Sequence, residues 1–566
     1  MDFNPTPFDL LSALLTWSQV FGTAVLLVLL ASFVGLTGSR GTEGVLAWVQ
    51  HVGDFCRDLF SLSPRRIAAL TQLTLREALR RKALLVFVVF AILFMFAGWF
   101  LSSTNLPPEN QPRLYVSFVL RAIMWLMLPL VLLLSCWGLP EDIRLRSLHT
   151  VVTKPVHRVE VVLGRMLGYS VIAGLVLAVM GFVGWAWIVR QLPAEAQPYL
   201  TCRKPIFGTL HFRDREGNER DAKGNLLTAG INTGDVWEFR SYIEGATKAR
   251  AIWKFEGVTA DLLDPRGNLL LESRFQAFRS YKGDLSRPLY YQYVLVNPET
   301  GLRVPTRFRE VNEFRFRVDE IPRKLPKVAE VATDTPSADG KQAYDLIDDI
   351  VSPQGELVVE VSCADPNQYL GMSRPDLFIR TPDLPFVAGY TKAVICIGMV
   401  LLLVIFLGVT ASTFAKGPVA TLLTFCLIVV GMTARDFMGC LVGDEYALQK
   451  VSLYAGGRQA AQSGGGVFES IYRVVTHMNP TVPLPEGPAT AAMKRVDQAI
   501  VGFLWLVHKI IPDFEYSDRA MRYLAGGFDV DWSSAFFPTI MLTLAYFIPC
   551  VLLGQFALRV RELEAK

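Results

Sequence analysis

Charged residues are scarce in this chain of 566 residues: they make up 19%, against 51% hydrophobic residues, and the formal net charge is only +4. So small a positive excess gives no basis for binding nucleic acid, which needs a clustered basic surface. The six histidines are spread along the chain. The sequence contains no GxxxxGK[ST] phosphate loop, no HExxH and no GxSxG element. We therefore expect no catalytic residues, no metal site and no cofactor.

The eight cysteines are scattered, with no CxxC pair and no Cys/His spacing suited to zinc. Most lie in apolar segments, where we expect inert thiols. Cys202 and Cys363 fall together in a polar middle region. Outside the cytosol they could form a disulfide. Spacing alone leaves a disulfide and two separate thiols as equal alternatives.

Seven segments are long and apolar enough to cross a bilayer as helices, since about 20 apolar residues span roughly 30 Å of hydrocarbon. The third and fourth flank the short polar stretch EDIRLRSLHTVVTKPVHRVEVVLGR at residues 141–165. The sequence thus predicts a polytopic α-helical membrane protein. The seven segments are residues 11–36, 83–101, 115–139, 166–189, 386–409, 419–438 and 535–558.

Basic residues beside these segments orient the chain, because short loops rich in Lys and Arg stay on the cytoplasmic side. The last segment is followed by RVRELEAK, which places the C-terminus in the cytoplasm and the N-terminus outside. We expect a multi-pass protein of the plasma (inner) membrane. Lys392 lies near the outer end of its segment, where its side chain can snorkel to the interface. The loop at residues 141–165 is cytoplasmic by its basic residues Arg144, Arg146, Lys154, Arg158 and Arg165.

Residues 63–82, SPRRIAALTQLTLREALRRK, have an apolar arc opposite a basic one. Pro64 suits the first turn of a helix. This pattern favours a helix that lies at the cytoplasmic membrane surface. The alternative is a plain basic flank of the next membrane segment.

Two polar regions interrupt the apolar ones. Residues 190–385 contain short alternating runs separated by explicit turns such as DPRGN and NPETG. They predict an inserted, extracytoplasmic β-sandwich or jelly roll. In the second polar region, residues 499–507 are apolar but too short to cross, which favours a re-entrant or interfacial helix.

The expected organisation follows from these segments. The parts are an extra N-terminal transmembrane helix with a cytoplasmic connector (1–62), the surface helix and three transmembrane helices (63–189) with a cytoplasmic loop at 140–165, the extracytoplasmic β-rich domain (190–385), two transmembrane helices (386–442), a second extracytoplasmic segment (443–532), and the last transmembrane helix with its tail (533–566).

The loop resembles the first cytoplasmic loop of ABC-2 type transporter permeases. That family's pattern is an acidic residue, a run ending in Lys-Pro, an Arg and then a Gly-Arg pair. TLREALRRKALLVF, TASTFAKGPVATLLTFCLIVVG and FALRVREL match other family segments in order. The chain departs from the family at Arg146-Ser147, where Gly-Thr is usual, and in its first span and β insert. The matching loop residues are Glu141, Lys154, Pro155, Arg158, Gly164 and Arg165.

The resemblance implies the membrane-spanning subunit of an ATP-driven exporter. Two permease subunits, identical or different, would pair in the bilayer, and a separate ABC ATP-binding subunit would hold the ATP and magnesium. The loop would dock on that subunit and couple its closure to the spans. The residues expected to carry this contact are Glu141, Arg144, Arg146, Lys154, Pro155, Arg158 and Arg165.

Two other classes stay open. A membrane-anchored binding or scaffold protein would act through the β domain, although seven spans exceed what an anchor needs. A membrane enzyme acting on lipid or glycan would need a nucleophile, base or metal cluster that the sequence does not display. For the basic loop residues themselves, the alternative to coupling is that they only fix the topology.

Overall fold

The computed structural model describes residues 8–80, 110–144, 157–220, 224–231, 240–279, 288–311, 316–326, 343–442, 467–478 and 487–564, together with 89, 92, 93, 108 and 484. The chain divides into two compact units. One comprises Met1–Pro5, Arg203–Leu384 and Gly439–Gly502, and the other comprises Thr6–Cys202, Pro385–Met438 and Phe503–Lys566. We call them the β unit and the helical unit.

Among its described residues, the helical unit contains six helices long and apolar enough to cross a membrane: Leu10–Gly35, Gln111–Glu141, Arg158–Gln191, Phe386–Phe414, Gly417–Ala434 and Trp532–Arg559. They confirm six of the seven predicted segments as apolar helices, and the seventh, 83–101, lies almost wholly outside the described residues. The helix bounds are α1 Leu10–Arg40, α2 Thr42–Phe60, α3 Pro64–Arg80, α5 Gln111–Arg144, α7 Arg158–Gln191, α8 Phe386–Phe414, α9 Gly417–Val429, α10 Arg435–Val442, α13 Val467–Val475, α14 Pro488–Ile510, α15 Glu515–Ala525 and α16 Phe537–Glu564.

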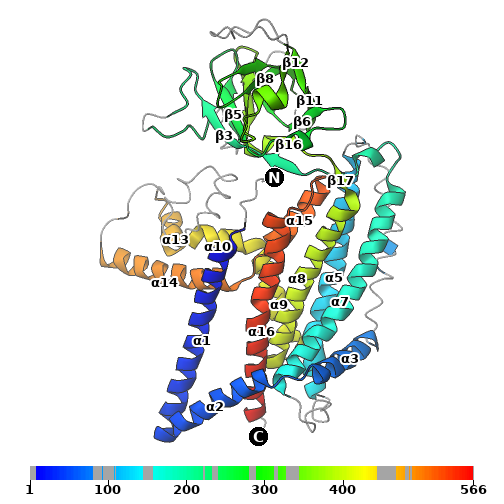
Figure 1. Ribbon diagram of the computed structural model, residues 1–566. Coiled ribbons are helices and arrows are strands. Elements are labelled where there is room, and N and C mark those ends of the chain that lie inside the picture. The colour runs from blue at the N-terminus through cyan, green and yellow to red at the C-terminus, as the bar shows by residue number, and fades with distance from the viewer. Residues whose placement is uncertain are drawn as a thin grey trace. The chain divides into compact units, whose positions relative to one another are not determined.

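Helix α8 is the centre of the helical unit and packs against α5, α7 and α16 (Figure 1). Two thirds of its most apolar stretch is buried, whereas none of that of α1 is. Small and hydroxyl residues let the helices approach closely and form hydrogen bonds, as they do in membrane helix bundles. For example, the Thr410 hydroxyl of α8 donates to the Cys550 carbonyl of α16 at 3.0 Å.

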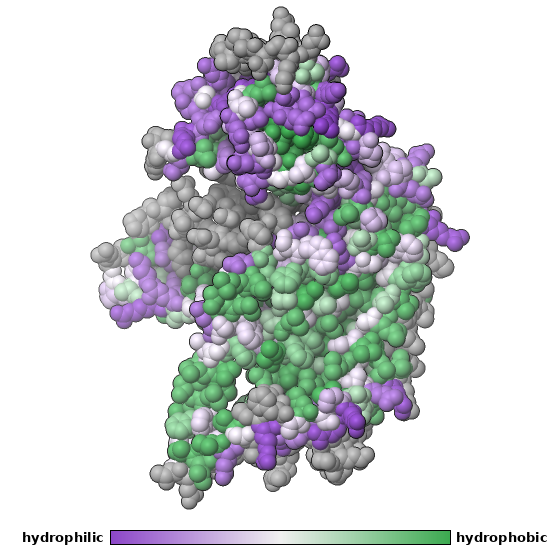
Figure 2. All heavy atoms as spheres, in the orientation of Figure 1, coloured by the Kyte–Doolittle hydropathy of each residue, from purple (hydrophilic) through white to green (hydrophobic). Residues whose placement is uncertain are grey.

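The surface of the helical unit is divided by polarity. Apolar residues cover the visible sides of its long helices, and polar residues gather at the end where α2 and α3 lie (Figure 2). The predicted helix at residues 63–82 is present as α3, so the sequence pattern identified this element correctly.

The β unit is built from antiparallel sheets, as the alternating pattern predicted. The largest has the order β10-β8-β14-β5-β3 with β9 on β8; the others are β11-β6-β16-β2, β4-β15-β7 and β12-β13. The strand bounds are β2 Pro205–Phe207, β3 Thr209–Arg213, β4 Ser241–Glu244, β5 Arg250–Phe255, β6 Asn268–Ser273, β7 Gln276–Arg279, β8 Tyr290–Val296, β9 Arg303–Pro305, β10 Arg309–Glu310, β11 Arg317–Pro322, β12 Lys324–Pro326, β13 Ala343–Asp345, β14 Leu357–Cys363, β15 Gln368–Met372 and β16 Leu377–Arg380.

One hydrophobic core joins these sheets. Inward-facing residues of the large sheet, such as Trp253 and Val359, and of the β6–β16 pair, such as Leu271 and Ile379, belong to the same buried cluster. Burying aromatic side chains of this size contributes several kcal/mol each, at roughly 25 cal/mol per Å² of apolar surface. Trp253, Phe255, Tyr291 and Tyr293 are thus core residues, whereas Tyr290 is exposed.

Residues 499–507 form part of a longer helix than expected, the 23-residue α14. This helix is amphipathic and is not among the six apolar ones. After it, α15 packs against α5 and α8 within the helical unit.

Candidate coupling site

Only part of the predicted coupling set lies in the described structure. Arg146, Lys154 and Pro155 fall outside it, as does the side chain of Arg144. Glu141 is half-buried in the last turn of α5. Residues 145–156 therefore connect the end of α5 to His157, the residue before α7. The site can be built from the two helix ends that hold this loop.

A buried carboxylate ties the start of α7 to the start of α3. The Glu160 side chain is fully buried in the first turn of α7. It accepts hydrogen bonds from the Ser63 N–H at 2.8 Å, from Arg66 Nε at 3.0 Å and from the His157 N–H at 3.0 Å. Glu160 thus satisfies backbone donors at the N-termini of two helices, where negative charge is favourable.

A second ion pair joins the same two helices, five residues further along α7. Arg165 Nη1 lies 2.7 Å from Glu77 Oε2 of α3 and also donates to the Tyr169 hydroxyl at 3.4 Å. The Arg165 residue is only 8% exposed. This arginine, predicted as a contact for a partner, is therefore used inside the chain.

Glycine allows α3 and α7 to pack at close range. A Cβ atom on Gly164 would come within 2.5 Å of Leu70 Cβ, and one on Gly168 within 2.5 Å of Thr74 Cβ. The spacing of four places both glycines on one face of α7, as in the small-xxx-small contacts of membrane helices. We call the contacts of Glu160, Arg165, Gly164 and Gly168 with α3 the α3–α7 joint.

Helix α2 contacts the first residues of α7 as well. Asp58 Oδ1 lies 3.0 Å from His157 Nδ1, and Asp58 Oδ2 lies 3.6 Å from Arg158 Nη1. The other ring nitrogen of His157 is 3.1 Å from the Ser61 hydroxyl. Arg158, which was also predicted as a contact for a partner, is thus ion-paired within the chain.

The other end of the loop is held by α9. Trp137 Nε1, in the last two turns of α5, donates to the Thr421 hydroxyl of α9 at 3.0 Å. A Cβ on Gly417 would meet the same indole ring at 3.2 Å. Both ends of the loop at residues 145–156 are therefore anchored to other helices.

An ion pair is also present near the opposite ends of the spans. Lys392 Nζ of α8 lies 2.7 Å from Asp529 Oδ2 and 5.1 Å from the centroid of the Trp532 ring. The Asp529 residue is 7% exposed. Sequence reasoning placed Lys392 near the outer end of its segment and named no partner; the structure adds Asp529, a carboxylate 137 residues further on in the chain, which pairs with its charge.

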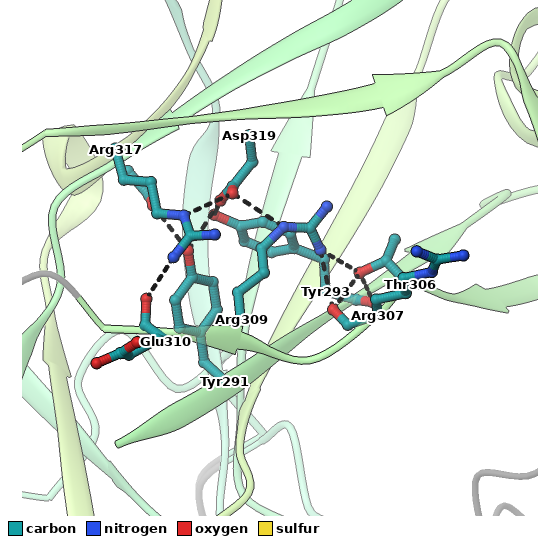
Figure 3. A network of polar contacts seen from close by, with 9 residues as sticks. Tyr291, Tyr293, Thr306, Arg307, Arg309, Glu310, Arg317 and Asp319 are labelled. Carbon is teal, nitrogen blue, oxygen red and sulfur yellow. Dashed lines mark hydrogen bonds and ion pairs between the residues drawn. The ribbon is translucent and has the colours of Figure 1, made fainter. Parts of the chain in front are cut away.

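Four buried carboxylates organise the β unit, and each contacts two arginines. Asp319 accepts from the hydroxyls of Tyr291 and Tyr293 at 2.8 and 3.1 Å and pairs with Arg309 and Arg317 at 2.9 Å (Figure 3). Burial and the Asp319 charge raise the pKa of Tyr291 to about 12. The other groups are Asp376 with Arg240 and Arg274, Glu272 with Arg203 and Arg380, and Glu360 with Arg213 and Arg303.

These carboxylates keep the arginines occupied within the unit. Burial raises the pKa of Glu272, and the positive charges of Arg203 and Arg380 oppose the shift. A buried charge stays ionised only when it is paired in this way. We therefore interpret the four groups as structural.

The disulfide left open by the sequence is not formed. Cys202 and Cys363 are both buried thiols. The Cys202 thiol lies 3.9 Å from the Phe386 carbonyl oxygen, and the Cys363 thiol 3.9 Å from that of Asp365. Burial raises the pKa of the Cys363 thiol to about 12, so this cysteine is unreactive at neutral pH.

Sequence reasoning missed the residues that hold the loop from outside it, namely Asp58, Ser61, Glu77 and Glu160. A signal for Glu160 was present, because an acidic residue in the first turn of a helix is a capping position. Glu77 has a weaker signal, since it lies on the basic stretch TLREALRRK. Comparison with known proteins adds no further assignment: no family model, no curated protein and no solved structure matches this chain.

Proposed function

We propose that this chain is the membrane-spanning permease subunit of an ABC-2 type exporter. Its loop at residues 140–165 docks on a separate ATP-binding subunit, and a second permease subunit completes the transporter. The six apolar helices support the membrane location. The motifs around Lys154 and Pro155 support the family.

The observation that carries the proposal is the anchoring of the two helices that flank the loop. Trp137 holds α5 to α9 about two turns before residue 145, and Glu160 and Arg165 hold the first turns of α7 to α3. A loop that must transmit force to the spans needs such rigid attachments, whereas a loop that only fixes topology does not. Movement at residues 145–156 would be passed to α5 and α7 together.

In this proposal the β unit is a β-sandwich outside the cytoplasm. The spans carry few charges, and Lys392, a charged residue within a span, is paired with Asp529. Ions inside a membrane protein are costly unless neutralised. A lipid-linked or amphiphilic substrate fits such spans better than a hydrophilic solute.

The proposal is tested by purification from native membranes in mild detergent. The unsubstituted protein should bring down a Walker-motif ATPase with measurable ATP hydrolysis. A variant with Arg144, Arg146, Lys154 and Arg158 changed to alanine should lose it, because charge-assisted contacts are removed. Absence of an ATPase from both preparations would contradict the proposal and favour a scaffold protein that acts through its β unit.

A further inference from the structure

Helix α2, with the extra span α1 before it, has no role in the function proposed above. The two helices are bonded to each other: Trp48 Nε1 donates to the Ser32 hydroxyl at 3.0 Å, and the Trp48 ring packs edge-on against Phe33. The hairpin that they form is thus a defined structural element.

This hairpin is attached to α16. Trp17 Nε1 of α1 donates to the Ala545 carbonyl at 3.0 Å. Near the end of α2, Gln555 Nε2 of α16 donates to the Phe55 carbonyl at 3.5 Å. One hydrogen bond from α1 and one from α2 thus link the hairpin to α16.

The C-terminal end of α2 reaches the point where the loop ends. Asp58 contacts both His157 and Arg158, and Ser61 contacts the second nitrogen of His157. His157 is the residue that precedes α7, so these contacts hold the exit of the loop at residues 145–156. The Asp58 residue is only partly exposed, which strengthens its pairing relative to a fully solvated ion pair.

We infer that α1 and α2 form a strap that sets the position of the coupling loop, with Asp58 as its positioning residue. The inference rests on the proposed function and adds a regulatory element to it. Because the strap is hydrogen-bonded to α16 and contacts His157 and Arg158, a displacement of α16 changes the geometry at His157, where the loop ends. Conversely, a movement of the loop on docking is transmitted through α2 to α16.

The contacts also follow the order of a serine hydrolase triad: His157 lies between the Ser61 hydroxyl and the Asp58 carboxylate. The positioning role is favoured because Asp58 shares its carboxylate with Arg158, and the His157 backbone is bonded to Glu160. The three side chains thus belong to a network that joins helix ends. Such a network holds structure without requiring a substrate.

The first test is hydrogen exchange of the peptide at residues 157–162 in the purified full-length protein. The amides of Glu160 and Val161 both donate to the His157 carbonyl, so they report on the loop exit. Asp58→Ala should speed their exchange about tenfold, as expected when hydrogen bonds to a charged group are lost. Asp58→Glu should restore protection, and Arg57→Ala, an exposed charge on the same helix, should leave it unchanged.

The second test measures ATP hydrolysis by the complex with its ATP-binding subunit. Asp58→Ala should retain the subunit but lower hydrolysis at least about fivefold, the size of an ordinary coupling energy. Unchanged exchange, or unchanged hydrolysis in a complex that has formed, would overturn the strap. Failure of the unsubstituted protein to bind any ATPase would instead overturn the proposed function, so the two failures are distinct.

Discussion

At the scale of single residues, Glu160 is the most constrained group of the coupling site. It is fully buried and accepts two backbone N–H groups and a guanidinium. Removing one partner of a buried charge network lowers the free energy of unfolding by more than the whole network contributes to it. The reason is that the remaining buried groups are left without partners. The residue therefore matters for the integrity of the α3–α7 joint, although it lies in α7 and outside residues 145–156.

We predict that Glu160→Ala destabilises the helical unit by about 3 kcal/mol, the lower end of the range for breaking a buried pair. Thermal unfolding of the detergent-solubilised protein, followed by tryptophan fluorescence, measures the change. Glu195→Ala is the matched control, since Glu195 is exposed beyond the end of α7. Equal melting temperatures for the two variants would show that the Glu160 contacts contribute little.

At the scale of secondary-structure elements, the packing of α3 on α7 decides whether the loop and the spans move as one. Gly164 and Gly168 have no room for a side chain on the face toward α3. Gly174 lies on the same helix, and a Cβ there would meet nothing within 4 Å. The contrast between these glycines separates packing from helix propensity.

Gly164→Ala should weaken the α3–α7 contact, because the added methyl group overlaps Leu70 and overpacking costs about 1–3 kcal/mol. Gly174→Ala should be neutral or stabilising by up to about 1 kcal/mol, since alanine favours helix. Cross-linking of a cysteine pair placed on α3 and α7 reports the helix separation. Equal cross-linking yields in the two variants would mean that close approach at Gly164 is not needed.

At the scale of the whole molecule, the apolar helices and the β-rich insert were predictable because hydropathy and turn residues are local signals. The α3–α7 joint was not predictable, because Glu160 and Ser63 are separated by 97 residues and nothing in the sequence pairs them. The same is true of Asp319 and the hydroxyl groups of Tyr291 and Tyr293, which are 28 and 26 residues away in the chain. Lys392 shows the limit: its position in a span was readable, but its partner Asp529 was not.

The central claim is that residues 145–156 touch an ATP-binding subunit, and photo-cross-linking tests it most directly. Lys154 is replaced by p-benzoylphenylalanine in the full-length protein, and the membranes are irradiated before purification. Glu299, a turn residue of the β unit, serves as the control position. We predict a covalent product that contains a Walker-motif ATPase from position 154 and none from position 299. A cross-link from position 154 only to lipid, or to no protein at all, would contradict the account.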